Sequence, residues 1–119
     1  MHADLEKTWE KYTSAWKMTS KAERLATFSE ALADNAIYTD PLVRATSWDE
    51  LISCMENLHQ QIPGAHFVTT HFMSHHQKSI ANWEMKTQEN ITVGTGISYG
   101  EYDDQGRLIS MNGFFENNS

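Results

Sequence analysis

The sequence is poor in cysteine, proline and basic residues. One cysteine, Cys54, occurs among 119 residues, so no disulfide can form within the chain. Nine Lys and Arg residues stand against sixteen Asp and Glu, which gives a formal net charge of −7 at pH 7. Because no cluster of Lys and Arg is present to neutralise phosphates, we expect neither a nucleic acid nor an anionic membrane surface as a partner.

Long apolar runs are also missing. The N-terminal residues are polar and lack the apolar core of a signal peptide, and no run approaches the length of a membrane span. We therefore expect a cytoplasmic protein. The length fits a single domain over residues 1–119, with one core and room for one cavity.

Several chemical motifs are absent as well. Four histidines lie close together on one predicted strand: His66, His71, His75 and His76. No HxH, HExxH or CxxC pattern accompanies them, so we expect no metal and no bound cofactor. No serine lies in a GxSxG context. Cys54 falls within a helical apolar pattern, which favours a small buried hydrophobe over a nucleophile.

The first half of the chain has the 3.6-residue apolar period of helices. It predicts helices over 4–18, 20–34 and 47–62, and a short strand over 36–39 after a turn at Asp34-Asn35. Capping boxes begin the second helix at Ser20 and the third at Ser47, and Pro63-Gly64 ends the third. The second helix is expected to bury five apolar residues: Ala22, Leu25, Ala26, Phe28 and Leu32.

From residue 65 onward the apolar period changes to two, which predicts strands. The expected strands span 66–76, 79–89, 92–102 and 107–116, with a hairpin turn at residues 103–106. Strict alternation puts His71 and Met73 on the same face as Phe67, and Ile109 on the same face as Met111. The layout predicts an α+β fold, in which three N-terminal helices pack on a curved, mainly antiparallel sheet.

One face of the 92–102 strand is expected to line a cavity. Gly94, Gly96 and Gly100 share that face, and a strand glycine needs a structural reason. Room for a ligand is one reason, and close packing on a strongly curved sheet is the other. Large side chains predicted on the surrounding faces could line the cavity or form plain core: Trp16, Tyr38, Met55, Trp83, Met85, Met111 and Phe115.

Asp40 is the candidate for chemistry, because it follows the short strand and precedes Pro41. An aspartate in such a place most often shapes a turn by accepting hydrogen bonds from nearby amides. The functional interpretation is a general base at the cavity mouth that abstracts a proton next to a carbonyl group.

The order of elements, the Ala36-x-x-x-Asp40-Pro41 junction and the Asp103-Asp104-Gln105-Gly106-Arg107-Leu108 hairpin resemble the NTF2-like superfamily over nearly the whole chain. The resemblance is closest to its SnoaL-like and ketosteroid-isomerase-like branch. It implies a cone-shaped fold that hosts isomerases, cyclases, dehydratases, epoxide hydrolases and non-catalytic binding proteins. The Arg-Asp-Asp arrangement of the epoxide hydrolases is not evident.

The resemblance implies a base without its usual partners. Asp40 matches the aspartate that moves the proton in the isomerases. Their two oxyanion donors, a tyrosine and an aspartic acid, correspond to Trp16 and Ser98, and a supporting tyrosine corresponds to Met55. Loss of such a donor costs about 10²–10³ in rate. The apolar pocket positions of the family are kept, at Ala81, Trp83, Met85, Met111 and Phe115.

The resulting hypothesis is a protein with a pocket for a small apolar organic molecule. It is either a cofactor-free isomerase, cyclase or dehydratase that uses Asp40 as base on a carbonyl compound, or a non-catalytic ligand-binding or dimerisation module. The residues expected to contact the ligand are Tyr12, Trp16, Tyr38, Met55, Trp83, Met85, Ser98, Met111 and Phe115. The resemblance also implies a homodimer through an apolar outer sheet face of Val93, Ile97, Tyr99, Leu108 and Phe114, a face that could instead bind a different protein.

Overall fold

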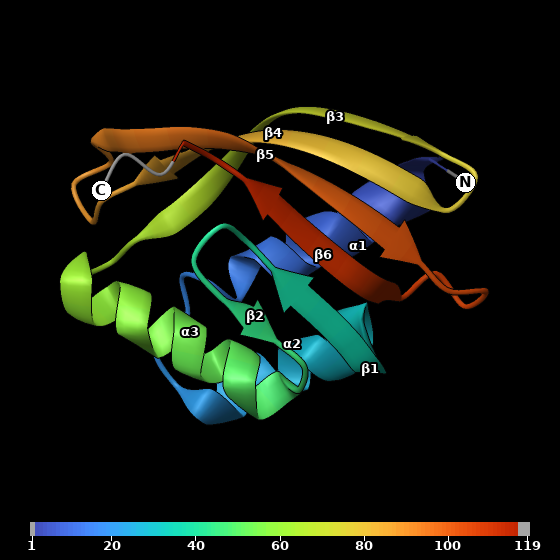
Figure 1. Cartoon of the computed structure of the whole chain (residues 1–119), viewed down its shortest axis with the longest axis horizontal. Coiled ribbons are helices and arrows are strands. Elements are labelled where there is room, and N and C mark those ends of the chain that lie inside the picture. Colours follow the sequence, from blue (N-terminus) through green and yellow to red (C-terminus); the bar gives the residue numbers. More distant parts are fainter. Residues whose placement is uncertain (1, 117–119) are drawn as a thin grey trace.

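A computed structural model describes residues 2–116, with side chains from residue 4 onward. Its elements are α1 (His2–Ser14), α2 (Lys21–Ala31), β1 (Leu32–Thr39), β2 (Arg44–Ala45), α3 (Trp48–Gln61), β3 (His66–His75), β4 (Lys78–Lys86), β5 (Thr92–Tyr102) and β6 (Leu108–Phe114). The strands form one sheet in the order β2-β1-β6-β5-β4-β3, and helices and sheet together confirm the predicted α+β class (Figure 1).

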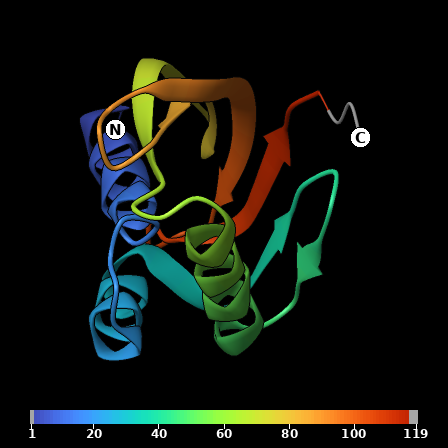
Figure 2. The same cartoon turned by 90° about the vertical axis from the view of Figure 1, so that its left-hand side faces the viewer.

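The sheet is antiparallel throughout except where β1 runs parallel to β6. Figure 2 shows it as an arch, with the three helices filling the open side. The concave face therefore lies against the helices, and the convex face is the outer face. None of the helices in the described part of the chain is long and apolar enough to cross a membrane.

The helix starts follow the predicted capping residues. Ser20 Oγ accepts a hydrogen bond from Glu23 N at 3.1 Å, and Ser47 Oγ accepts one from Glu50 N at 3.1 Å. The end of α1 was predicted wrongly at residue 18. The α-helix ends at Ser14, and tight turns with i→i+3 hydrogen bonds, such as Trp16 N to Thr13 O at 3.1 Å, continue to Met18.

The buried face of α2 also differs from the prediction. Ala22 and Ala26 are exposed, whereas Arg24 and Thr27 are buried. Arg24 lies inside because its guanidinium donates to two backbone carbonyls where α1 ends, and one of them, Ala15 O, also accepts from Met18 N at 3.2 Å. Its Nε donates to Ala15 O at 3.1 Å and its Nη2 to Met18 O at 2.5 Å. A buried guanidinium is tolerated when its donors are paired in this way.

The region around β1 is more extended than the sequence indicates. No turn breaks the chain at Asp34-Asn35, because β1 already begins at Leu32. The pairing of β1 with β6 has a register shift between Leu32 and Ile37. Leu32 pairs with Leu108, and Ile37 pairs with Ser110. The parallel β1–β6 pairing and the short strand β2 were not predicted.

Two further register shifts reverse the alternation of strand faces. Thr70 is an extra residue between the pairs Thr69–Trp83 and His71–Asn82, and Ile109 is one between Leu108–Tyr102 and Ser110–Glu101. Because of each extra residue, the strand residues on one side of it lie on the opposite face of the sheet from the one that strict alternation predicts. His71 and Met73 therefore lie exposed rather than beside Phe67, and Ile109 is exposed although Met111 is buried.

The shift at Ile109 also corrects the predicted outer face. Leu108 is fully buried in the core, where it packs under Gly100. Val93 lies at a fourth shift, between the pairs Met85–Gly94 and Lys86–Thr92 near the start of β5, and it is 48% exposed. Ile97 and Phe114 remain exposed on the outer face, at 43% and 61% of their surface.

The buried Arg24 predicts a large stability effect at one position. Arg24→Met keeps the apolar stem but leaves the Met18 carbonyl without a donor and the Ala15 carbonyl with Met18 N alone, so we expect the free energy of unfolding to fall by about 2–4 kcal/mol. Urea unfolding of the variant measures this. The control is Lys21→Met on the same helix, which breaks only an exposed ion pair with Asp49 and should change stability by less than about 0.5 kcal/mol. Equal effects of the two changes would contradict the role given to Arg24.

Candidate functional site

A cavity of about 520 Å³ lies between the helices and the concave face of the sheet. Helices α1 and α3, the β1–β2 loop and strands β3–β6 all contribute to its lining. Eight of the ten predicted site residues line it: Tyr12, Trp16, Tyr38, Asp40, Trp83, Met85, Ser98 and Phe115. The structure therefore brings these residues together, and their roles with a ligand stay predictions.

Met55 and Met111 are not part of that lining. Both are buried in the core. On α3 the cavity-facing residues are Cys54, Asn57, Leu58 and Gln61, which form one helical face. Met55 points to a different side of the helix and packs in the core with Leu51 and Ile52. The sequence does not show which large apolar residues belong to the core and which line a cavity.

Asp40 shapes the β1–β2 loop and also faces the cavity. Its Oδ1 accepts hydrogen bonds from Leu42 N at 2.8 Å and Val43 N at 3.0 Å, while its own N–H donates to Val43 O at 2.9 Å. Its Oδ2 accepts from the Tyr38 hydroxyl at 2.5 Å. The two interpretations of the sequence thus apply to different oxygens of one carboxylate, because Oδ1 forms the turn and Oδ2 lies at the cavity with Tyr38.

Gly113 on β6 provides the space beside Asp40. A Cβ atom at this position would lie 3.5 Å from Asp40 Cβ, 3.7 Å from Tyr38 Oη and 3.8 Å from Ser98 Oγ. Three polar side chains therefore converge on a point without a side chain of its own. Sequence reasoning gave Gly113 no role, although the period-two pattern placed it on the face of Met111 and Phe115.

Tyr12 supplies a hydroxyl group at this polar end of the cavity. Its Oη accepts a hydrogen bond from Trp16 Nε1 at 3.1 Å, which is its one hydrogen bond within the described residues. Burial raises the pKa of Tyr12, and the bond from Trp16 opposes the shift. The phenol therefore stays protonated at neutral pH, and its O–H is available to donate to a ligand oxygen. Tyr12 lies on α1, one helical turn before Trp16 in the sequence.

Two neighbours of Asp40 stay uncharged. Burial, together with the negative charges that Tyr12 and Asp40 would present, raises the pKa of Tyr38 well above the usual value. Burial and the nearby Asp40 likewise raise the pKa of the half-buried Cys54 thiol. Cys54 is therefore a neutral thiol in the cavity wall, which does not favour a nucleophile.

One wall of the cavity is a chain of five rings in contact, here called the aromatic arc: Tyr38, Trp16, Phe67, Trp83 and Phe115. Successive ring centroids lie 5.6, 5.3, 5.0 and 6.2 Å apart, with tilted or edge-to-face geometry. Phe67 was not predicted as a site residue. Trp9 also lines the cavity, and its Nε1 is the one buried side-chain N or O without a partner in the part of the chain described.

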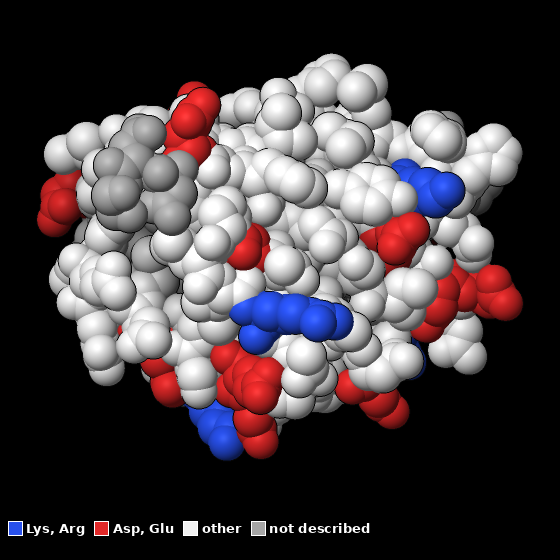
Figure 3. Space-filling model, viewed as in Figure 1, with Lys and Arg blue, Asp and Glu red and all other residues white. Residues whose placement is uncertain are grey.

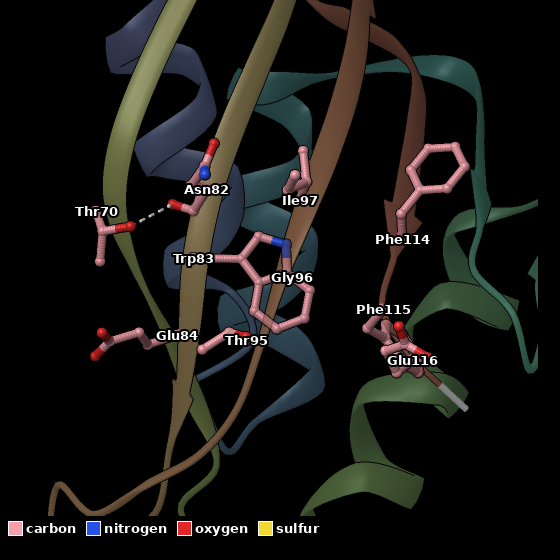
Figure 4. Close-up of a pocket in the computed structure, with 10 residues that line it drawn as sticks. All are labelled: Thr70, Asn82, Trp83, Glu84, Thr95, Gly96, Ile97, Phe114, Phe115 and Glu116. Carbon is pink, nitrogen blue, oxygen red and sulfur yellow. Dashed lines mark hydrogen bonds between the residues drawn. The ribbon is translucent and has the colours of Figure 1, made fainter. Parts of the chain in front are cut away.

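A groove of about 640 Å³ lies on the other side of this wall (Figure 4). It shares four lining residues with the cavity: Trp83, Thr95, Phe115 and Glu116. The last β5–β6 pair is Ile97–Phe114, so the two strands part beyond it. Figure 4 shows the Trp83 indole lying across Gly96, and Trp83 Nε1 donates to Ser98 Oγ at 3.0 Å. Trp83 and Phe115 thus separate the groove from the cavity.

No group of three or more His, Cys, Asp or Glu residues that could hold a metal ion occurs within residues 4–116. His75 Nδ1 and His76 Nδ1 lie 3.1 Å apart, but both histidines are exposed at the β3–β4 turn. His59 instead has a structural contact, because its Nε2 is 2.6 Å from Trp16 O and 3.1 Å from Ala65 O.

The close approach of Trp83 to Gly96 gives a matched pair of variants on β5. A Cβ at Gly96 would lie 2.2 Å from Trp83 Cζ2 and 2.7 Å from Phe114 O, so Gly96→Ala must displace the indole from Ser98. We expect it to destabilise the fold by about 1–3 kcal/mol and to change the indole N–H NMR signal of Trp83. In Gly94→Ala the nearest atom is Met85 Cε at 3.7 Å, so stability should change by less than about 1 kcal/mol. Unchanged stability of Gly96→Ala would contradict the close approach of Trp83 to Gly96.

No protein-family model and no curated protein matches the chain. Solved structures do. A protein of Agrobacterium tumefaciens, provisionally assigned as an isomerase of the SnoaL-like family, superposes with a TM-score of 0.86 at 22% identity over 97% of this chain and 99% of its own. A provisionally assigned SnoaL-like polyketide cyclase from Jannaschia gives 0.78 at 10% identity over 97% and 87%. A de novo designed protein with a curved β-sheet gives 0.74 at 9% identity over 98% and 88%. The chain therefore has the NTF2-like fold of the SnoaL-like proteins.

Proposed function

We propose that the cavity binds a small, mostly apolar carbonyl compound and that Asp40 moves a proton on it, as a cofactor-free isomerase, cyclase or dehydratase would. The observation that supports this most directly is the convergence of Asp40, Tyr38 and Ser98 around Gly113 inside the cavity. The provisional names of the neighbours with the same fold, isomerase and polyketide cyclase, fall in the same classes of reaction.

The proposed step is abstraction of a proton from the carbon next to the carbonyl group. Asp40 Oδ2 takes the proton, the C–H electron pair forms a new C=C bond, and the π pair of the carbonyl moves to its oxygen to give an enolate. The Tyr12 O–H donates a hydrogen bond to that oxygen, because Tyr12 Oη already accepts from Trp16 and has its proton free. Return of the proton to another carbon isomerises the compound. Alternatively, a hydroxide leaves from the β-carbon as the enolate reforms the carbonyl, takes up the proton that Asp40 holds, and departs as water, which dehydrates the compound.

Tyr38 and the aromatic arc would prepare the site for this step. The Tyr38 hydroxyl holds Oδ2 in place, and the amides of Leu42 and Val43 hold Oδ1, so the carboxylate needs no reorganisation when a ligand arrives. The rings exclude water and provide apolar surface for the body of the ligand. Tyr12 supplies the oxyanion contact that Trp16 and Ser98 do not provide at the family's two donor positions.

The proton-transfer step can be tested without knowledge of the natural substrate. A small cyclic ketone such as 2-tetralone exchanges its α-protons for deuterium in D₂O, and NMR follows the exchange. We expect the protein to accelerate the exchange and Asp40→Asn to lower that acceleration by about 10²–10⁴. The amide oxygen of the introduced asparagine would still accept from Leu42 N and Val43 N, so the fold should persist. Tyr12→Phe should lower the acceleration of the exchange by about 10²–10³.

The alternative is a non-catalytic ligand-binding module in which Asp40 only shapes the loop. Its Oδ1 contacts with Leu42 and Val43 are the observation that favours this alternative. Binding of 2-tetralone without any acceleration of exchange by the unaltered protein would establish this alternative, and exchange by Asp40→Asn at the accelerated rate of the unaltered protein would reject Asp40 as the base.

We also propose a homodimer that packs through the outer sheet face. Ile97 and Phe114 present a large apolar surface there, and solvent-exposed apolar patches of this kind mark interfaces. Leu108 is no longer part of this surface, since it is buried.

Analytical ultracentrifugation tests the dimer. We expect twice the chain mass for the unaltered protein and a shift to the monomer in Phe114→Asp. Ile91→Asp introduces the same charge at an exposed apolar residue of the turn between β4 and β5, outside the outer sheet face. It should leave the dimer intact, and a monomeric unaltered protein would contradict the proposal.

A further inference from the structure

The cavity has acidic but no basic side chains in its described lining. Asp40 and Glu116 contribute carboxylates, and no Lys, Arg or His is among the described lining residues. The outer groove adds Glu84, again with no basic residue of its own. Lys86 lies 3.3 Å from Glu84 and balances that charge, but no such ion pair with Asp40 or Glu116 occurs within the described chain. Figure 3 shows charged side chains scattered over one face, without a basic cluster.

The aromatic arc adds a second feature that favours positive charge. Its five rings run from Tyr38, which is bonded to Asp40, to Phe115, which precedes Glu116. The face of an aromatic ring is electron-rich and attracts ammonium groups, most strongly where water is excluded. The cavity thus has a carboxylate at each end of a wall of rings.

Asp40 also keeps capacity for one more contact. A carboxylate offers about four acceptor sites. Three are used, by Tyr38 O–H and by the N–H groups of Leu42 and Val43. Two of these contacts are to Oδ1 and one is to Oδ2, so the remaining acceptor site belongs to Oδ2. An ammonium N–H can occupy it, whereas an anionic group there would meet a carboxylate with no nearby cation.

We infer that the cavity selects its ligand by charge: it binds a small organic cation, an amine or quaternary ammonium on an apolar body, more tightly than the matched neutral ketone, and it rejects the matched carboxylate. The inference rests on the cavity being a ligand site, the first part of the proposed function, and does not depend on turnover. If Asp40 also catalyses proton transfer, the expected substrates are carbonyl compounds that carry an amine.

Three compounds with the same bicyclic body test this ranking: 2-aminotetralin, which is protonated at neutral pH, 2-tetralone, and tetralin-2-carboxylate. The titration is followed by NMR through the tryptophan indole N–H signals. Trp9, Trp16 and Trp83 line the cavity, and Trp48, which donates to Ala33 O at 3.0 Å outside it, is the internal control. We expect the amine to bind about tenfold more tightly than the ketone, and the carboxylate about tenfold more weakly than the ketone.

Asp40→Asn removes the negative charge of the side chain and nearly keeps its shape, so it tests the effect of the charge alone on ligand affinity. It should reduce the advantage of the amine over the ketone several-fold and improve binding of the carboxylate, with the ketone nearly unchanged. Glu89→Gln makes the same change in net charge at an exposed residue outside the cavity, so all three affinities should stay the same. Phe67→Leu removes the central ring of the aromatic arc and should weaken the amine more than the ketone.

Two results would overturn the inference: a carboxylate that binds as tightly as the amine, or an amine advantage that Asp40→Asn leaves intact. Either result with a working proton exchange would leave the proposed function standing. Conversely, the charge ranking without any exchange would reject the base and keep the inference. Changes in the indole N–H signal of Trp48 alone, or no change in any indole signal at millimolar ligand, would contradict both the inference and the proposed ligand site.

Discussion

The site depends on the absence of side chains at two points of the concave sheet face. At Gly113 this absence leaves room where Asp40, Tyr38 and Ser98 meet, and at Gly96 it lets the Trp83 indole cross the strand to reach Ser98. A Cβ at Gly96 would overlap the indole, so the position of one cavity wall follows from a missing atom. The curvature of the sheet and the packing of α1 and α3 then enclose the space.

The polar end of the cavity combines structural and chemical contacts in the same groups. One oxygen of Asp40 holds the β1–β2 loop, and the other accepts from Tyr38. Trp16 donates to Tyr12 and thereby orients the phenol with its proton free. Burial keeps the pKa values of Tyr12 and Tyr38 high, so both are hydrogen-bond donors and not anions beside the carboxylate. A preorganised acceptor next to a preorganised donor is what proton transfer at a carbonyl compound requires.

The periodicity of the sequence predicts the helices and the strands, because burial on one face leaves a regular pattern. Of the three glycines on the predicted cavity face of β5, Gly94 lines the cavity, whereas Trp83 covers Gly96 and Leu108 packs against Gly100. Thr70 and Ile109 break the prediction, since a single extra residue in a strand reverses the faces without a signal of its own. Arg24 breaks it too, because its partners are backbone carbonyls that the sequence does not show. At the site, Asp40 stood out by its place before a proline, whereas Tyr12 as a donor and Gly113 as space follow only from three-dimensional contacts.

A crystal structure of the protein with bound 2-tetralone tests the central claim most directly. We predict that the ketone oxygen lies within hydrogen-bonding distance of Tyr12 Oη, that an α-carbon lies beside Asp40 Oδ2, and that the ring system contacts the aromatic arc. A ketone bound only in the outer groove, or an Asp40 carboxylate turned away from Tyr38 and the ligand, would contradict the assignment of this cavity as the site of proton transfer.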